Sequence, residues 1–550
     1  MRHLLCLIAL ITPLTLFAAP KFPFPQKATY EYGIMPADID HDKVQAAYED
    51  FMELYKESSD GSMARIQFDD LSYTVSEGIG YGMLTLVYMD NEKNNTQGKF
   101  DKLWKYYNNF LDPKGLMDWK IKEFSGAEGM YDHNSATDGD IDVAIALMEA
   151  YKQWGDEKYF TDAKNLIDKI SSNDVTTDGY LNPGDSWGAS PPKYNPSYFN
   201  TAALQVFKEA GTFDWDKVIS NSYNLMKKVQ NSNTGLIPAW CTKEGTHLSG
   251  DDDTYQYDAT RIPWRMAWAY CWFGHQDAYD IAAKITSWIS TETSNSPADI
   301  VDGYQMDGNP TNGGKWNNAS FVGPFACGGM VDSKHQEWLD DCYSHLESLD
   351  ENQYYKISLK VITLLLLSGN MPNLWNYNPV EKFTVSTSAT PQQGGTITVK
   401  PQGTEFDDGT QITLTAQPAE GYSFVSWSGD ATGNSANTTV TVSKDMNVTA
   451  TFEIKNGINT IHKSNNKSTQ IISTESTSGP AISYTIASPG LVSIRVYTTS
   501  GELIATPINN VITSRGTHTI SLNTSFPAGI YLIQMHTANG KVTGKISLTK

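Results

Sequence analysis

Three acidic residues that lie far apart along the chain each stand near the expected start of a helix, next to small or polar residues. They are Glu77 in "VSEGIGYGM", Asp138 in "SATDGDIDVAIALMEAYKQW" and Asp258 in "YQYDATRIPWRMAWAY". Paired carboxyl groups suit acid–base hydrolysis, in which a protonated group donates to the leaving oxygen and an ionised group activates water. In a helical barrel the starts of the helices can gather at one end. We therefore expect the three acids to converge on a cleft.

Gly78, Gly80 and Gly82 alternate directly behind Glu77. A glycine inside a helix costs about 1 kcal/mol relative to alanine, so three of them need a reason. They would let backbones approach closely around the acid, and burial raises the pKa of a carboxyl group and keeps it protonated. The plainer alternative is an ordinary first-turn acid in a helix capped by Ser76. A phosphate-binding loop is disfavoured, because the third glycine of a dinucleotide fingerprint and a following Lys-Ser/Thr are missing.

The aspartates in "ATDGDID" raise the question of a metal. Asp138, Asp140 and Asp142 alternate as in the start of a calcium loop, but the glycine and distal glutamate of such a loop do not follow. Alternate residues of a helix do not share a face. We expect Thr137 or Asp138 to cap a helix, one aspartate to face a cleft, and the others to face backbone or solvent. The acidic run 251–253 is expected to be a solvated loop, and we expect neither a metal nor another cofactor.

The residues from about Lys21 to Trp375 carry many amphipathic helical patterns, with apolar residues recurring at intervals of three and four. Long loops rich in Gly, Pro, Asp, Asn and aromatic residues separate them, such as "GYLNPGDSWGASPPKYNPSYF". Loops of this length inside a compact domain usually carry function. Many helices joined by such loops suggest a helical barrel with a binding face, in which Trp264 and Trp268 pack internally.

The pattern changes after this helical region. Residues 381–453 alternate in the manner of strands and predict a small all-β module, in which Trp427 is expected in the core rather than in a sugar site. The polar segment 454–480 predicts a flexible linker. Residues 481–550 alternate again and predict a second sandwich-like β module.

Charge and cysteines restrict the partners. The 550 residues carry a formal net charge of −21, which should repel nucleic acid and anionic lipid. The opening "MRHLLCLIALITPLTLFAAP" predicts a signal peptide over 1–19, and no later stretch is apolar enough to span a bilayer. We expect a monomer. The cysteines beyond that peptide lack CxxC spacing, which disfavours zinc and leaves buried thiols or one or two disulfides open: Cys241, Cys271, Cys327 and Cys342.

The three acidic motifs, in this order, resemble glycoside hydrolase family 8, together with "GLMDWK", "LNPGDSWG", "NPSYF", "FVGPFACGG" and "LLLLSGNMPN". Val143 departs mildly from the pattern. The resemblance implies an (α/α)6 barrel over residues 20–378 and an inverting hydrolase of β-1,4-linked polysaccharides. By position, Glu77 matches the general acid, Asp258 the general base and Asp138 the acid that grips and distorts the sugar. An aspartate at 258 is typical of the cellulase and xylanase branch rather than the chitosanase and lichenase branch.

Further residues match the family's substrate cleft, where aromatic rings stack on the apolar faces of sugars. Arg261 and Tyr257 flank Asp258, and the arginine could orient that carboxylate, although packing and an ordinary ion pair are the alternative. Tyr354 is not separated from Tyr355 by the sequence. The matching aromatic positions are Trp119, Trp187, Tyr198 and Tyr354.

The β modules also show resemblances. "GYSFVSWSGD" with "NVTATFE" is similar to InlB-type B-repeats and favours a spacer, with carbohydrate binding as the alternative. The tail from "VSIRVYTTSGELI" to the end resembles a type IX secretion C-terminal sorting domain, which implies recognition by secretion machinery and a secreted or cell-surface protein. The leading hypothesis is a secreted endo-β-1,4-glucanase. A xylanase on the same fold and a non-catalytic surface glycan-binding protein are the alternatives.

Overall fold

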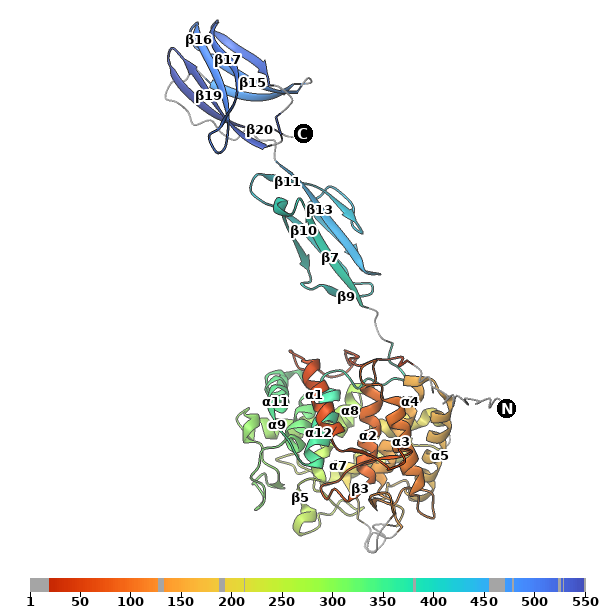
Figure 1. Cartoon of the computed structure of the whole chain (residues 1–550). Coiled ribbons are helices and arrows are strands. Elements are labelled where there is room, and N and C mark those ends of the chain that lie inside the picture. Colours follow the sequence, from red (N-terminus) through yellow and green to blue (C-terminus); the bar gives the residue numbers. More distant parts are fainter. Residues whose placement is uncertain are drawn as a thin grey trace, which may run out of the picture. The chain divides into compact units, whose positions relative to one another are not determined.

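The chain divides into two compact units, with the boundary between Pro379 and Val380 (Figure 1). The expected signal peptide lies outside the described residues apart from Ala19. Among the residues described, no helix is both long and apolar enough to cross a membrane. The computed structural model describes residues 19–126, 133–186, 193–211, 213–378, 382–454, 470–476, 479–522, 526–527 and 529–548.

The described part of the first unit holds twelve α-helices of two alternating kinds. A helix that is apolar all round is a buried helix, whereas an apolar stripe marks a helix that covers a core. The buried kind comprises α2 (Ser76–Tyr88), α4 (Thr137–Trp154), α6 (Thr201–Phe207), α8 (Ile262–Phe273), α10 (Ala319–Gly329) and α12 (Tyr354–Leu367). The striped kind comprises α1 (His41–Met52), α3 (Gln97–Asn109), α5 (Glu157–Asn173), α7 (Asp216–Val229), α9 (Gln276–Glu292) and α11 (Gln336–Ser348).

The buried helices form a closed ring. Each of α2, α4, α6, α8 and α10 contacts the next buried helix, and α12 contacts α2. Each striped helix packs mainly on one member of the ring, α1 on α12 and each other one on the ring helix that precedes it in the chain, from α3 on α2 around to α11 on α10. The predicted helical periodicity therefore corresponds to an inner ring covered by an outer layer of helices.

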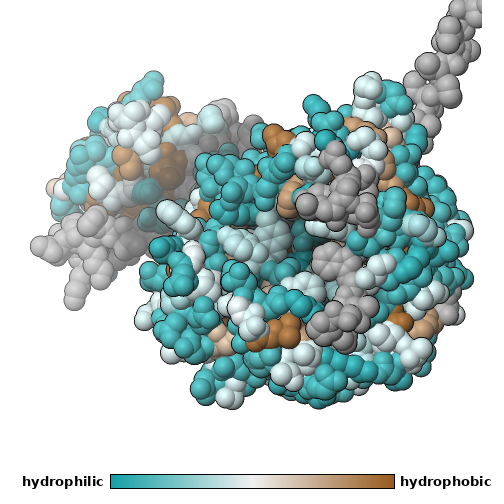
Figure 2. All heavy atoms as spheres, turned by 90° about the horizontal axis from the view of Figure 1, so that it is seen from below, coloured by the Kyte–Doolittle hydropathy of each residue, from teal (hydrophilic) through white to brown (hydrophobic). Residues whose placement is uncertain are grey.

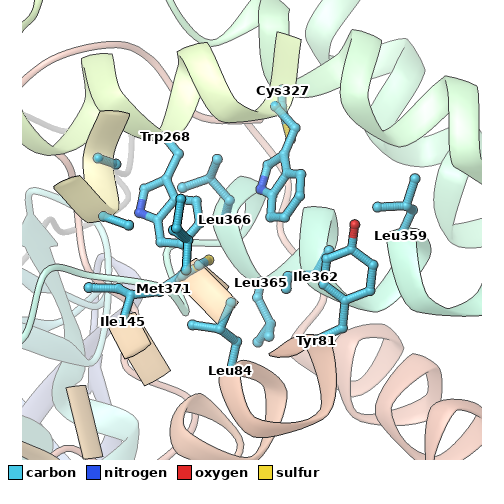
Figure 3. Close-up of a cluster of buried hydrophobic side chains, with 14 of the residues drawn as sticks. Tyr81, Leu84, Ile145, Trp268, Cys327, Leu359, Ile362, Leu365, Leu366 and Met371 are labelled. Carbon is cyan, nitrogen blue, oxygen red and sulfur yellow. The ribbon is translucent and has the colours of Figure 1, made fainter. Parts of the chain in front are cut away.

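The core of the first unit lies inside this ring. Tyr81 of α2 lies beside Ile362 and Leu359 of α12, and its ring packs on that of Trp264 of α8 (Figure 3). Trp264 and Trp268 are fully buried and stack with ring centroids 5.8 Å apart, as predicted. All four cysteines of this region are free and buried, which answers the choice between thiols and disulfides.

Short paired strands lead into the helices at one end of the unit. β3 (Tyr73–Val75) pairs with β4 (Lys120–Lys122) and runs directly into α2. β5 (Thr254–Tyr255) pairs with β6 (Tyr304–Gln305) and ends three residues before Asp258. β3 and β5 both lie at the lower edge of the helical unit in Figure 1. The segments carrying Glu77 and Asp258 are thus fixed at the same end of the ring. A further pair joins β1 (Tyr55–Glu57) to β2 (Ala64–Ile66).

Glycines set the close approach of α2 to α4. A Cβ atom at Gly139 would lie 2.8 Å from the backbone nitrogen of Glu77, and one at Gly80 would lie 2.7 Å from the Cβ of Asp142. Real Cβ atoms do not approach other atoms so closely, so both positions need glycine. This bears out the expectation that the glycines beside Glu77 serve close packing.

The expected helix caps are wrong. α2 begins at Ser76 itself, and the preceding Val75 makes no side-chain cap. Ala136 precedes α4, again without a side-chain cap, and the Thr137 hydroxyl instead donates to the carbonyl of Asn182 at 2.8 Å. The close approach of the two helix starts explains the difference, because Gly139 abuts Ser76 and the carbonyl of Asn182 takes the Thr137 hydroxyl.

The first β module folds as two facing sheets around Trp427, which is buried as predicted. Its sheets have the strand orders β12-β10-β8 and β11-β13-β7-β9, and the β13–β7 pair is parallel. The strands are β7 (Lys382–Thr390), β8 (Gly395–Lys400), β9 (Glu405–Asp407), β10 (Gln411–Pro418), β11 (Tyr422–Gly429), β12 (Asn437–Thr441) and β13 (Met446–Ile454).

The second β module has sheets ordered β14-β15-β18 and β17-β16-β19-β20. It begins inside the segment predicted as a linker, because β14 pairs antiparallel with β15 and buries Ile471. The Ser/Thr-rich composition of β14 does not indicate a strand, because the strand is stabilised by pairing with β15. The strands are β14 (Gln470–Ser476), β15 (Gly479–Ile486), β16 (Gly490–Thr498), β17 (Leu503–Thr513), β18 (Gly516–Ser521), β19 (Gly529–Thr537) and β20 (Gly540–Leu548).

Candidate active site

The guanidinium of Arg261 joins the three acids singled out by the sequence. Arg261 stands just before α8 and is 1% exposed. Its Nη1 donates to Glu77 Oε2 at 2.5 Å and to Asp138 Oδ2 at 2.7 Å, and its Nη2 donates to Asp258 Oδ1 at 3.3 Å. Acids separated by up to 181 residues in sequence, from 77 to 258, therefore meet at one cation. The prediction that the three acids lie together is confirmed.

The acids open into a cleft of about 670 Å³. Figure 2 looks from below onto the end of the first unit where β3 and β5 lie, and the surface there is hollowed near its centre within a largely hydrophilic rim. The side chain of Asp258 is 42% exposed, that of Glu77 17% and that of Asp138 4%, so access to solvent differs among the three. Six aromatic residues line the same cleft: Phe68, Trp119, Tyr198, Trp240, Tyr257 and Tyr355.

Glu77 is held in an environment that favours its protonated form. Burial, together with the nearby Asp138 and Asp258 carboxylates, raises the pKa of Glu77 to about 7. The Arg261 charge and a hydrogen bond from the Tyr354 hydroxyl to Glu77 Oε1 at 2.8 Å oppose that shift. A carboxyl group in this balance keeps its proton in mildly acidic solution and loses it near neutrality.

Asp258 also accepts two hydrogen bonds. Its Oδ1 accepts from Arg261 and its Oδ2 accepts from the indole N–H of Trp240 at 3.2 Å. Burial raises the pKa of Asp258, while Arg261 and the Trp240 bond lower it. Two charge-stabilising donors and the greatest exposure of the three acids suit Asp258 to act as an ionised carboxylate in contact with water.

Only some of the predicted substrate residues line the cleft. Trp119, Tyr198 and Tyr257 line the cleft, whereas Trp187 lies outside the described residues. Tyr354 is 1% exposed and contacts Glu77 rather than lining the cleft. Its neighbour Tyr355 lines the cleft and donates its hydroxyl to the carbonyl of Tyr257 at 2.5 Å. Arg261 is buried, and its guanidinium contacts all three carboxylates.

Comparison with family models agrees with this arrangement. Residues 22–369 match the model described as "Glycosyl hydrolases family 8". The chain belongs to glycosyl hydrolase family 8. Residues 385–456 match the "Divergent InlB B-repeat domain" and residues 480–549 the "Secretion system C-terminal sorting domain". The protein is therefore a glycoside hydrolase with a module that indicates export, and its substrate is a polysaccharide.

Relatives cover most of the family 8 region. "Endoglucanase 2" of Ruminiclostridium josui is 34% identical over 392 residues, which are 68% of this chain and 81% of that protein. "Beta-glucanase" of Niallia circulans is 32% identical over 401 residues, 68% of this chain and 96% of that protein. The apo structure of a beta-1,3-1,4-glucanase from Paenibacillus sp. X4 is 31% identical, with a TM-score of 0.60 over 64% of this chain and 99% of that one.

Sequence reasoning missed several residues of this glycoside hydrolase site. Trp240 stands in a polar loop, "IPAWCTKEG", which is the signal that singled out Trp119. Ser197, whose Oγ lies 2.7 Å from Arg261 Nη2, belongs to the "NPSYF" motif that drew attention only to Tyr198. No spacing in the sequence reveals the contact of Trp240 with Asp258 or that of Ser197 with Arg261.

The other two aspartates of α4 do not face backbone or solvent as expected. Asp140 is fully buried and accepts from the Tyr107 hydroxyl at 2.5 Å. Asp142 is fully buried and accepts two hydrogen bonds from Arg265, at 2.8 and 2.5 Å. Side chains from other helices supply partners that local sequence does not show. Within the described residues, no group of three or more His, Cys, Asp or Glu side chains could hold a metal ion.

Proposed function

We propose that this family 8 protein is a secreted, inverting endo-β-1,4-glucanase, with Glu77 as general acid and Asp258 as general base. The observation that carries the proposal is that three carboxylates share the single buried cation Arg261 at an aromatic-lined cleft. One cation cannot neutralise three ionised carboxylates, which favours retention of a proton on the group with the pKa of about 7, Glu77.

The proposed reaction is a single displacement. Glu77 donates its proton to the glycosidic oxygen while the bond from that oxygen to the anomeric carbon breaks. Asp258 accepts a proton from a water molecule as the water oxygen bonds to the opposite side of the anomeric carbon. The product therefore has the inverted configuration. Asp138 grips and distorts the sugar at the cleavage point, and Arg261 holds all three carboxylates in register.

The fold proposal is equally specific. We infer that the closed ring of even-numbered helices and its outer layer form the (α/α)6 barrel of the family. The alternation of inner and outer helices along the chain supports this inference. Such a barrel places one end of every inner helix on a common face, where the first turns of α2 and α4 and the segment before α8 bring Glu77, Asp138 and Asp258 together.

The substrate proposal rests on the relatives and on the cleft. The names endoglucanase and beta-glucanase, borne by relatives that are 32–34% identical, support a β-glucan. Trp119, Tyr198, Trp240, Tyr257 and Tyr355 offer aromatic faces on which pyranose rings stack. The intact set of three carboxylates argues against a binding protein that has lost its activity.

Export is part of the proposal. The match over 480–549 supports delivery by a secretion system that recognises C-terminal sorting domains. We propose that residues 1–19 act as the signal peptide for the first step of export, that the β module over 385–456 is a spacer, and that the secreted enzyme is a monomer.

A substrate panel tests the activity. Reducing ends released from carboxymethylcellulose, lichenan, xylan and chitosan should be most abundant with a β-glucan, and Glu77→Gln should abolish them. Preferential release from xylan would replace the glucanase by a xylanase on the same fold. Failure on all four polymers, with binding retained, would favour the glycan-binding alternative.

A further inference from the structure

Trp316 is a large apolar residue that lies mostly in solvent. Its side chain is 70% exposed, more than any other large apolar side chain described in the first unit. Tryptophan is highly buried on average, so an indole exposed to this extent beside a sugar-binding cleft is a candidate surface for stacking on a ligand. Trp316 stands in "NGGKWNNAS" and is not part of the cleft lining.

The backbone of Trp316 is held firmly. Asp302, only 8% exposed, accepts from the backbone nitrogens of Lys315 at 2.9 Å and of Trp316 at 3.0 Å through its Oδ1. The next residue, Asn317, donates its amide to the carbonyls of Pro297 at 2.8 Å and Ile300 at 2.9 Å. Both sides of Trp316 are therefore anchored. The indole is presented to solvent by a braced segment rather than by a loose one.

The same anchor reaches the cleft. Asp302 Oδ2 accepts from the Tyr257 hydroxyl at 2.8 Å, and Tyr257 lines the cleft beside the proposed base Asp258. One carboxylate therefore joins a cleft-lining ring to the backbone of Trp316. The residue just before β6 also packs against the cleft lining, because a Cβ atom at Gly303 would lie 3.4 Å from the side chain of Gln256. Trp316 is thus fixed close to the Tyr257 end of the cleft.

We propose that Trp316 is an additional sugar platform just outside the cleft, at its Tyr257 end. An indole face offers flat apolar surface to the C–H groups of a pyranose ring, while its exposed edge stays in water. The ligand class is a β-linked glucan chain long enough to extend beyond the cleft. This inference rests on the proposed function, because it assigns a further subsite for the same polysaccharide.

The direct test compares Trp316→Ala with Lys315→Ala on a short and a long substrate, cellotetraose and carboxymethylcellulose. Lys315 is the exposed neighbour, and its backbone contact to Asp302 remains in the alanine variant. For Trp316→Ala we expect kcat/KM on the polymer to fall about two- to tenfold through KM, with kcat unchanged. Cellotetraose should be hydrolysed as by the wild type, and Trp316→Phe should retain most of the polymer activity. Lys315→Ala should match the wild type on both substrates.

Two outcomes would overturn the platform. Equal kcat/KM for Trp316→Ala and wild type on the polymer would show that no sugar uses the indole. An equal loss on both substrates would show that Trp316 acts by supporting Tyr257 rather than by binding sugar. Either outcome leaves the proposed glucanase intact. If the wild-type enzyme cleaved neither cellotetraose nor carboxymethylcellulose, the proposed function would instead be refuted.

Discussion

Arg261 and Arg265 stand four residues apart, and each binds an aspartate of α4, yet their surroundings differ in charge and in access to water. Arg265 meets the single carboxylate of Asp142 in a two-bond pair whose members are at most 1% exposed, and Asn200 donates to the same carboxylate at 3.1 Å. Arg261 meets three carboxylates that open into the cleft. The same residue types thus build two different centres one helical turn apart.

The difference shows what separates a structural ion pair from a reactive site. In the Arg265 pair one cation faces one carboxylate and both side chains are buried, so neither group can exchange a proton with a ligand. Around Arg261 negative charge is in excess, and burial raises the pKa of Glu77 to about 7. Excess charge and access to a cleft, rather than the presence of buried acids, mark the candidate active site.

The largest effect expected from breaking the Arg261 centre is on turnover. Glu77→Gln and Asp258→Asn should each lower kcat on β-glucan by at least about 10²–10⁴-fold, because each removes a proton-transfer group. An aryl glycoside whose leaving group needs no protonation should separate the roles. Glu77→Gln should hydrolyse it at a substantial rate, whereas Asp258→Asn should remain slow. Initial rates on both substrates check this.

Binding provides the control for this prediction. Both variants should retain affinity for a cello-oligosaccharide in calorimetry, since neither removes an aromatic platform. Recovery of Asp258→Asn, rather than Glu77→Gln, on the activated substrate would reverse the two proposed roles.

Breaking the Arg265 centre should affect stability instead. Asp142→Asn leaves Arg265 buried without its counter-charge, which should lower the free energy of unfolding by about 3–5 kcal/mol. Chemical denaturation measures this loss. Asp277→Asn is the matched control, because the Lys227–Asp277 pair is largely exposed and should contribute less than about 1 kcal/mol. A loss for Asp142→Asn as small as that for Asp277→Asn would contradict the structural role of the pair.

The smallest predicted effect concerns the pH dependence of the Arg261 centre. With Glu77 as the acid, kcat/KM of the wild type should fall above about pH 7, where Glu77 loses its proton. The Tyr354 hydroxyl donates to the Glu77 carboxylate and so favours its ionised form, which lowers the pKa. Removing that hydroxyl in Tyr354→Phe should therefore move the alkaline limb of the pH profile to higher pH.

Tyr355→Phe is the matched control for this shift. The Tyr355 hydroxyl donates to the carbonyl of Tyr257 rather than to a carboxylate, so its loss should leave the alkaline limb in place. An unmoved limb in Tyr354→Phe, or the same shift in both variants, would mean that the limb does not report the ionisation of Glu77.

These contrasts also show how far the sequence could predict the molecule. The intervals of apolar residues predicted the helical unit, and the motifs around Glu77, Asp138 and Asp258 predicted that distant acids converge. The spacing of the aspartates alone could not separate Asp138 from Asp142, and only the resemblance to the family did, because their partners Arg261 and Arg265 are fixed by how α4 and α8 pack in the ring. It also failed at the helix caps, where neighbouring segments rather than local side chains supply the hydrogen bonds.

Adjacent residues illustrate the same limit. Tyr354 and Tyr355 have equal polarity and shape, yet one lies against Glu77 and the other lines the cleft. Only the rotation of α12 about its axis separates them. Likewise β14 was hidden in a polar segment, because a strand edge gains its stability from a partner that local composition does not reveal.

The stereochemistry of the first product tests the central claim most directly. Proton NMR recorded within the first minutes of cello-oligosaccharide hydrolysis, before mutarotation, reports the configuration of the newly formed reducing end. If Glu77 and Asp258 act as acid and base in a single displacement, the α anomer appears first and the β anomer accumulates only later. A β anomer formed first would mean that configuration is retained, and would contradict the account of the Arg261 centre.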